Sequence, residues 1–183
     1  MSSPHRSIII PLSFYILLSV LLFNGLYISG CHLNIMGEPF IPPLKEQLIL
    51  NWKTFGTWEG INLGYPMFHR TATYIHFLNF LLASLGFDGI FVSKIYFFIL
   101  TILPGVLMFL FLREILKNNL TAFLGSFIYQ YSQIVYYQLA FSHYIWLLGY
   151  ALTPVILLLV YKYLSSKNFR YLLTAALFFS FLF

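Results

Sequence analysis

The sequence predicts an all-α integral membrane protein: a multi-pass helix bundle with a long first extracytoplasmic loop that contains interfacial helices. Two features of composition predict this class. The 183 residues are 60% hydrophobic and only 8% charged, whereas about a quarter of the residues in a soluble domain are charged. The mean hydropathy is +0.84. In addition, several uncharged runs approach the roughly 20 residues that a helix needs to cross about 30 Å of hydrocarbon.

The same composition excludes other classes. The chain has ten basic and five acidic side chains, too few to build a nucleic-acid surface, so we expect no nucleic-acid partner. A single cysteine, Cys31, excludes a disulfide scaffold and a cysteine-built metal site. The partner that the composition indicates is the lipid bilayer.

Four runs are predicted to cross the bilayer, at residues 8–29, 95–112, 120–141 and 144–161. Pro104 and Pro154 interrupt the second and fourth runs. Each removes a backbone donor, which is tolerated where a neighbouring helix covers the freed carbonyl. A fifth run, residues 171–183, would rise only about 20 Å as a helix. We therefore expect the 183 residues to be the N-terminal fragment of a longer protein, ending inside a helix.

Residues 75–87 are apolar but short, and the distribution of basic residues decides whether they cross. If they do not cross, a cytoplasmic N-terminus places six basic residues inside and four in the outer loop, residues 30–94; if they cross, two lie inside and eight outside. Cytoplasmic loops carry the excess of Lys and Arg. The first layout is therefore favoured, with 75–87 as an interfacial or re-entrant helix and a cell-membrane location. The six are Arg6, Arg113, Lys117, Lys162, Lys167 and Arg170.

Residues 28–31 have the form of a lipoprotein processing box, with a small residue before Cys31. The apolar run that precedes them is long for a signal peptide. We therefore expect an uncleaved anchor that ends at Gly30.

The outer loop carries the candidate chemistry. Residues 44–55 have apolar side chains at helical spacing and predict a second interfacial helix. Glu38 stands between Gly37 and Pro39, just beyond the first span. A carboxylate there can take a proton from an incoming hydroxyl, ligate a divalent cation or pair with a cation of the loop.

Arg70 follows an aromatic stretch of the same loop and could bind the phosphate of a lipid head group, because guanidinium pairs bidentately with phosphate. His143 lies at the predicted outer end of the third span, on the side of Glu38, where it could hydrogen-bond a phosphate or orient the loop. The spacings of His32, His69 and His76 match no metal-ligand motif, so no metal site is predicted from histidine.

The third predicted span carries Ser126, Gln130, Gln133 and Tyr137, spaced to share one face of a continuous helix. Polar groups in hydrocarbon need partners, so this stripe should face other helices or line a substrate cavity. No charge lies within the four complete spans, which disfavours an ion-coupled pump.

The layout resembles the N-terminal part of the GT-C class of membrane glycosyltransferases, particularly prokaryotic relatives of the arabinofuranosyltransferase and oligosaccharyltransferase kind. The resemblance rests on this layout and on short phrases that are not specific individually. They are Gly37-Glu38-Pro39-Phe40, Gly64-Tyr65-Pro66, Tyr129 to Ser132, Ser142-His143 and Thr153-Pro154.

The resemblance implies transfer of a sugar from a polyprenyl-phosphate donor on the extracytoplasmic face. Glu38, where many members have Asp, would be the general base or would ligate a divalent cation. Arg70 would bind the leaving phosphate, with Lys45, Lys53 and His143 as further candidates. Two alternatives stay open: a carrier or flippase for a lipid-linked or amphiphilic substrate, lined by the polar third span, and an assembly factor without chemistry.

Overall fold

The computed structural model describes residues 6–30, 41, 43–54, 58–59, 65–66, 70–140 and 143–180. Helices make up almost all of this described part. Two short strands, β1 (Trp58–Glu59) and β2 (Tyr65–Pro66), pair antiparallel with Trp58 opposite Pro66. Glu38, the Cys31 box and the phrase Gly37 to Phe40 lie outside the described residues.

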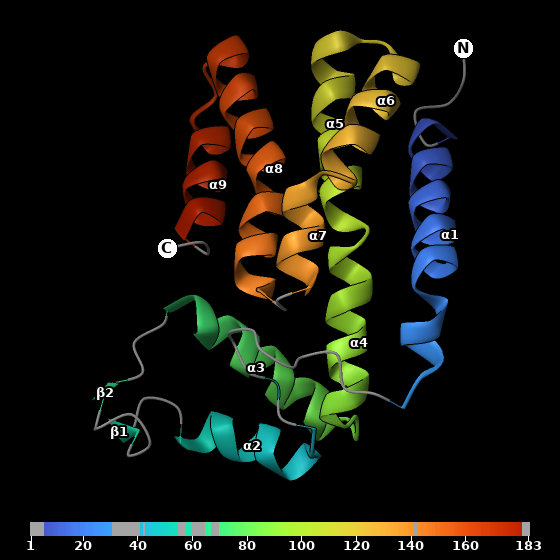
Figure 1. Cartoon of the computed structure of the whole chain (residues 1–183). Helices are drawn as coiled ribbons and strands as arrows, with labels where there is room; N and C mark the ends of the chain where they lie inside the picture. Colours follow the sequence, from blue (N-terminus) through green and yellow to red (C-terminus); the bar gives the residue numbers. More distant parts are fainter. Residues whose placement is uncertain are drawn as a thin grey trace.

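The long helices stand side by side and two others lie across one end of them (Figure 1). The upright helices are α1 (Arg6–Ile28), α4 (Gly89–Leu100), α5 (Leu103–Leu116), α6 (Asn119–Gln130), α7 (Gln133–Ala140), α8 (Tyr144–Ser166) and α9 (Phe169–Ser180). The two crosswise helices are α2 (Lys45–Thr54) and α3 (Arg70–Ser84), which we call the platform. They occupy the part of the chain where interfacial helices are predicted at 44–55 and 75–87.

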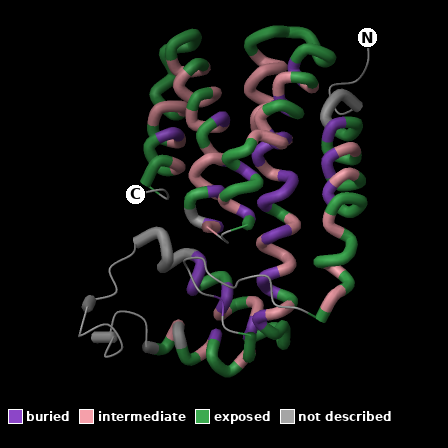
Figure 2. Tube along the Cα trace, in the orientation of Figure 1, coloured by how far each residue is buried: buried purple, intermediate pink, exposed green. Residues whose placement is uncertain are grey.

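Among the described residues, three helical stretches are long and apolar enough to cross a membrane: Ile9–Ile28, Gly89–Leu116 and Trp146–Ser166. Their outward surfaces are apolar. Ile10 is 72% exposed and Trp146 is 71% exposed, while buried residues gather on the inner sides of the helices (Figure 2). Large apolar side chains exposed along whole helices suit contact with lipid rather than water. The protein is therefore a membrane protein built of helices.

The predicted helix over 120–141 is not continuous. α6 ends at Gln130, Tyr131 and Ser132 form a turn, and α7 begins at Gln133. The stretch predicted at 95–112 begins earlier, at Gly89, and is also interrupted, because α4 ends at Leu100 and α5 begins at Leu103. The second interruption precedes Pro104, whose missing N–H cannot continue the hydrogen bonding of α4.

Two of the connecting turns use the same chemistry. Between α5 and α6, Lys117 adopts a left-handed conformation (φ 53°) and the Asn118 side chain accepts hydrogen bonds from the backbone of Leu120 and Thr121. Between α8 and α9, Lys167 is left-handed (φ 56°) and Asn168 accepts from the backbone of Arg170. In each turn a lysine ends one helix and an asparagine caps the next.

The platform packs on itself and on the bundle. Trp52 of α2 lies 5.3 Å from the ring of Phe77 and stacks on Phe80 of α3 at 5.9 Å between ring centroids. Leu48 of α2 and Ala83 of α3 belong to the same buried cluster as core residues of α4, α7 and α8. One continuous apolar core therefore joins the crosswise helices to the end of the upright ones.

Candidate functional site

Only some of the predicted site residues of the outer loop belong to the part of the chain that the structure describes. Glu38 lies outside the described residues. Arg70 is the first residue of α3, and its side chain also lies outside the description. Lys45 begins α2, and Lys53, which is exposed, lies in the last turn of α2. Eight residues of helix separate the two lysines by about 12 Å along the axis, so they form two separate positions rather than one cationic cluster.

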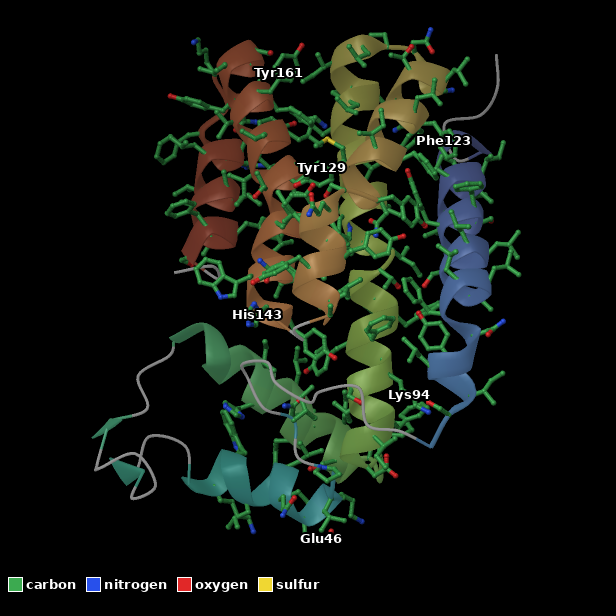
Figure 3. The ribbon with its side chains drawn as sticks, in the orientation of Figure 1. Glu46, Lys94, Phe123, Tyr129, His143 and Tyr161 are labelled. Atoms are coloured by element: carbon green, nitrogen blue, oxygen red, sulfur yellow. The ribbon has the colours of Figure 1, made fainter. Side chains whose placement is uncertain are left out.

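His143 lies immediately before α8, at the end of the bundle that the platform covers (Figure 3). Its Nδ1 is 2.9 Å from Oε1 of Gln138, and its backbone N–H donates to the Gln138 carbonyl, also at 2.9 Å. The amide oxygen can only accept, so Nδ1 carries the proton of this hydrogen bond. The ring is half-buried and held in one orientation by Gln138, a partner that the sequence pattern does not reveal.

The structure thus brings the platform and His143 to the same end of the bundle, where α1 finishes and α4 begins (Figure 1). At this end Lys94 of α4 donates to the backbone carbonyls of Tyr27 and Ser29 at the C-terminus of α1 (Figure 3). A cation suits the negative end of the helix dipole. The ammonium group of Lys94 is therefore engaged with α1.

The turns between α5 and α6 and between α8 and α9 lie at the opposite end, with the N-terminus (Figure 1). All six basic residues that are predicted to be cytoplasmic belong to this end. The described charges of the chain are consequently divided between the two ends of the bundle, with Glu114 and Lys117 forming an exposed ion pair at 3.3 Å on the second end.

The polar stripe predicted on the third span is split by the turn at Tyr131. Ser126 and Gln130 of α6 are fully buried, but Gln133 and Tyr137 of α7 are exposed. The four side chains share one face only if the helix is continuous, and the interruption turns the second pair outward.

The side chain of Gln130 forms hydrogen bonds with the backbone groups left unpaired where α4 ends and α5 begins. In a continuous helix the Gly105 N–H would donate to the Thr101 carbonyl. Here Gly105 N donates to Oε1 of Gln130 at 2.5 Å, and Nε2 of Gln130 donates to the Thr101 carbonyl at 2.7 Å. One side-chain amide is inserted between the two backbone groups, so both are satisfied in a region without water.

Tyr129, the preceding residue, hydrogen-bonds a backbone group of α8 that lacks its helical partner. Pro154 has no N–H, so the carbonyl of Tyr150 loses the donor that a continuous helix supplies. The Tyr129 hydroxyl donates to that carbonyl at 2.7 Å. Two adjacent residues of α6 therefore bind the backbone groups left unpaired near Pro104 and Pro154. We call these residues the proline junction: Thr101, Gly105, Tyr129, Gln130 and Tyr150.

Hydroxyl chains tie α1 to the same region. Ser126 donates to its own helix at Phe123, so Tyr15 is the donor in its 2.6 Å hydrogen bond to Ser126. Thr101 likewise donates to the Phe98 carbonyl, so Ser19 donates to Thr101 at 2.6 Å. Both chains end on a backbone carbonyl.

A narrow crevice lies beside the junction, bordered by Phe23, Tyr131 and Leu139 among others. It has no room for a water molecule. The Tyr131 hydroxyl is buried and has no hydrogen-bond partner among the described residues. The crevice is a packing gap rather than a passage for a substrate.

The polar side chains of α3 were not singled out by the sequence pattern, apart from His76. His76 and Asn79 are buried, with exposures of 6% and 1%. Burial lowers the pKa of His76, because a charged imidazole is poorly solvated there. Within the described part of the chain, no group of three His, Cys, Asp or Glu side chains could hold a metal ion.

Comparison with known proteins adds no relative: no protein family, no curated protein and no solved structure matches the chain. The functional argument therefore depends on the residues and on their arrangement.

Proposed function

We propose that the protein is a membrane glycosyltransferase of the GT-C kind, or the N-terminal part of one, which transfers a sugar from a polyprenyl-phosphate donor on the extracytoplasmic face. The observation that carries the proposal is the platform. α2 and α3 lie across one end of a bundle of apolar helices and share a buried core with it. Such a surface can hold a polar head group while its lipid chain stays among the helices.

The proposed orientation puts the platform outside the cell membrane and the N-terminus in the cytoplasm. The distribution of basic residues supports it, because the end opposite the platform holds Arg6, Arg113, Lys117, Lys162, Lys167 and Arg170. Single cysteines at positions 45, 117 and 167, in a Cys31→Ser background, test this orientation. An impermeant maleimide added to intact cells should label position 45 only.

In this proposal Glu38 accepts the proton of the acceptor hydroxyl and Arg70 binds the leaving phosphate. Transfer from a lipid phosphate needs a base for the nucleophile and cations for the departing charge. His143 has a fixed ring at the same end of the bundle, and Lys45 and Lys53 add positive charge on α2. Lys94 is not assigned to phosphate, because it already binds the end of α1.

The carrier alternative receives less support from the geometry. It needs the polar stripe of the third span to line a passage. Ser126 and Gln130 are instead hydrogen-bonded to neighbouring helices, and the crevice beside them is too narrow for water.

A transfer assay tests the proposal. Membranes containing the protein would be supplied with undecaprenyl phosphate that carries [14C]glucose, [14C]mannose or [14C]arabinose, and transfer to acceptors in the membrane fraction would be counted. Glu38→Gln should lower transfer by about 100-fold or more, the range for removal of a general base.

Glu46→Gln is the matched control, because Glu46 lies exposed on α2 (Figure 3) and its loss should leave transfer unchanged. Absence of transfer with all three donors, or equal activity of Glu38→Gln and wild type, would overturn the proposal.

A further inference from the structure

The side of α3 that is buried against the rest of the molecule carries two polar residues as well as the apolar Ile75 and Ala83. The two polar residues are His76 and Asn79. The opposite side carries Leu78 and Leu81, exposed by 46% and 41%, whereas Phe77, exposed by 42%, borders Trp52 of α2. A helix that only covered a core in water would expose polar residues where α3 exposes these leucines. The exposed side suits lipid, and the buried polar side needs another explanation.

Asn79 is the residue of that buried side whose polar atoms lack hydrogen-bond partners within the described part of the chain. It is 1% exposed, and neither its Nδ2 nor its Oδ1 has a hydrogen-bond partner among the described residues. Burying an amide without partners opposes folding, and most buried polar atoms in proteins are paired. An unsatisfied amide is therefore a position at which a polar ligand would gain hydrogen bonds and relieve this cost.

Asn79 lies close to the contact between α3 and α4 at the end of the bundle, which we call the seam. Ile75, one turn before Asn79 on the same face, accepts a hydrogen bond from the Tyr96 hydroxyl of α4 at 3.5 Å. The Tyr96 ring stacks on Tyr144 at 6.3 Å, and Tyr144 follows His143 at the start of α8. The seam thus leads from Asn79 toward the proposed head-group end of α8.

We infer that Asn79 is a binding residue for a neutral hydroxylated head group, such as the sugar of the lipid-linked donor, in the seam between α3 and the bundle. This inference rests on the proposed function and names a position for the sugar. An amide offers both a donor and an acceptor, which match neighbouring hydroxyl groups that both donate and accept.

A phosphate fits the position less well. A fully ionised phosphate only accepts hydrogen bonds, so it would satisfy Nδ2 and leave Oδ1 without a donor. In addition, Lys94 binds α1 and Lys53 is exposed on α2. The seam is therefore suited to the sugar rather than to the phosphate.

Asn79 is closed off from the surface in the present structure, so binding requires α3 to shift relative to α4. The 3.5 Å hydrogen bond between the Tyr96 hydroxyl and the Ile75 carbonyl is long and therefore weak. It offers little resistance to a movement of α3 away from α4.

The test uses the full chain in phosphatidylcholine nanodiscs, with dodecyl-β-D-glucoside as the sugar probe and dodecyl phosphate as the phosphate probe. A ligand that binds only the folded state raises Tm. The glucoside should raise the Tm of the wild type and of Asn24→Leu, a control at an exposed asparagine of α1. It should raise the Tm of Asn79→Leu much less. Any shift with dodecyl phosphate should be the same in all three proteins.

Without probe, Asn79→Leu should unfold at the same temperature as the wild type or higher, because the lone amide is gone. A lost response then reports lost binding rather than misfolding. The inference is overturned if Asn79→Leu responds like the wild type, if the wild type does not respond to the glucoside, or if the phosphate shift depends on Asn79. A wild type that shows the Asn79-dependent shift but transfers no sugar overturns the proposed function alone.

Discussion

Tyr129 and Tyr150 donate hydrogen bonds to each other's backbone carbonyls. The Tyr129 hydroxyl lies 2.7 Å from the Tyr150 carbonyl oxygen, the Tyr150 hydroxyl lies 3.0 Å from the Tyr129 carbonyl oxygen, and the rings stack at 4.1 Å. Pro154 deprives the Tyr150 carbonyl of its helical donor. The Tyr129 carbonyl lies at the end of α6, where the backbone N–H of Ser132 also donates to it at 3.4 Å. The two tyrosines therefore join α6 to α8 by donating to one backbone carbonyl in each helix.

Tyr129→Phe should lower the free energy of unfolding by about 1–2 kcal/mol, because it leaves the Tyr150 carbonyl unpaired in apolar surroundings. Pro154→Ala restores a backbone donor for the same carbonyl. In that background we expect Tyr129→Phe to cost about 1 kcal/mol less. A double-mutant cycle, measured by SDS unfolding in mixed micelles, checks this coupling. Tyr161→Phe, on an exposed tyrosine of α8, is the control, and additive effects at 129 and 154 would contradict the interpretation.

Gln130→Leu removes the amide that bridges Gly105 and Thr101. We expect a loss of about 2 kcal/mol, the usual cost of leaving buried backbone groups unpaired. Gln133→Leu should be nearly neutral, because Gln133 is exposed on α7. The same unfolding assay compares the two variants. If Gln130→Leu is as stable as Gln133→Leu, then Gly105 and Thr101 close their own hydrogen bond and the bridge is dispensable.

Gly105→Ala should destabilise the bundle by about 1–3 kcal/mol through overpacking. A Cβ at Gly105 would lie 2.8 Å from Cζ of Tyr15 and 3.1 Å from Cβ of Gln130. At Gly25 nothing lies within 4 Å of the added atom, so Gly25→Ala should be neutral or stabilising. Tyr15→Leu should recover part of the loss in Gly105→Ala. An equal effect of alanine at both glycines would show that the contact with Tyr15 is unimportant.

The buried His76 predicts a pH dependence of stability. Burial lowers the pKa of His76 from its ordinary 6.5. Below pH 6.5 the unfolded chain therefore takes up a proton that the folded chain does not bind. The free energy of unfolding should fall as the pH drops from 6.5 toward the folded pKa, and His76 should contribute no slope above 6.5.

Unfolding curves between pH 7.5 and 5 test this contribution. His76→Phe should flatten the dependence, whereas His143→Gln should retain the part that is due to His76. A slope that is unchanged in His76→Phe would mean that folding does not lower the pKa of His76.

The sequence could predict what depends on composition along the chain. Three of the four predicted runs coincide with stretches that can cross a membrane, whereas 120–141 is divided into α6 and α7 and is not among them. The change of composition after Gly30 marks the segment that forms the platform. The need for a neighbouring helix at Pro154 also follows from proline chemistry, and the contact from Tyr129 meets it.

The sequence could not predict the interruptions. Residues 120–141 are uncharged throughout, and nothing local requires a turn at Tyr131. The turn is compatible with the fold because Tyr150 caps the end of α6, a contact between residues that lie far apart in the sequence. The position of Lys94 at the end of α1 and the unpaired amide of Asn79 are likewise invisible until the helices are packed.

The two lysine–asparagine turns bear on how the chain enters the bilayer during synthesis. Each turn joins its two helices through only two residues, so neither helix can settle far from the other as it leaves the ribosome. In the proposed orientation Lys117 and Lys167 resist translocation. The pairs α5–α6 and α8–α9 would therefore enter the membrane as preformed hairpins, and the order of synthesis would place α6 beside α5 before α8 emerges.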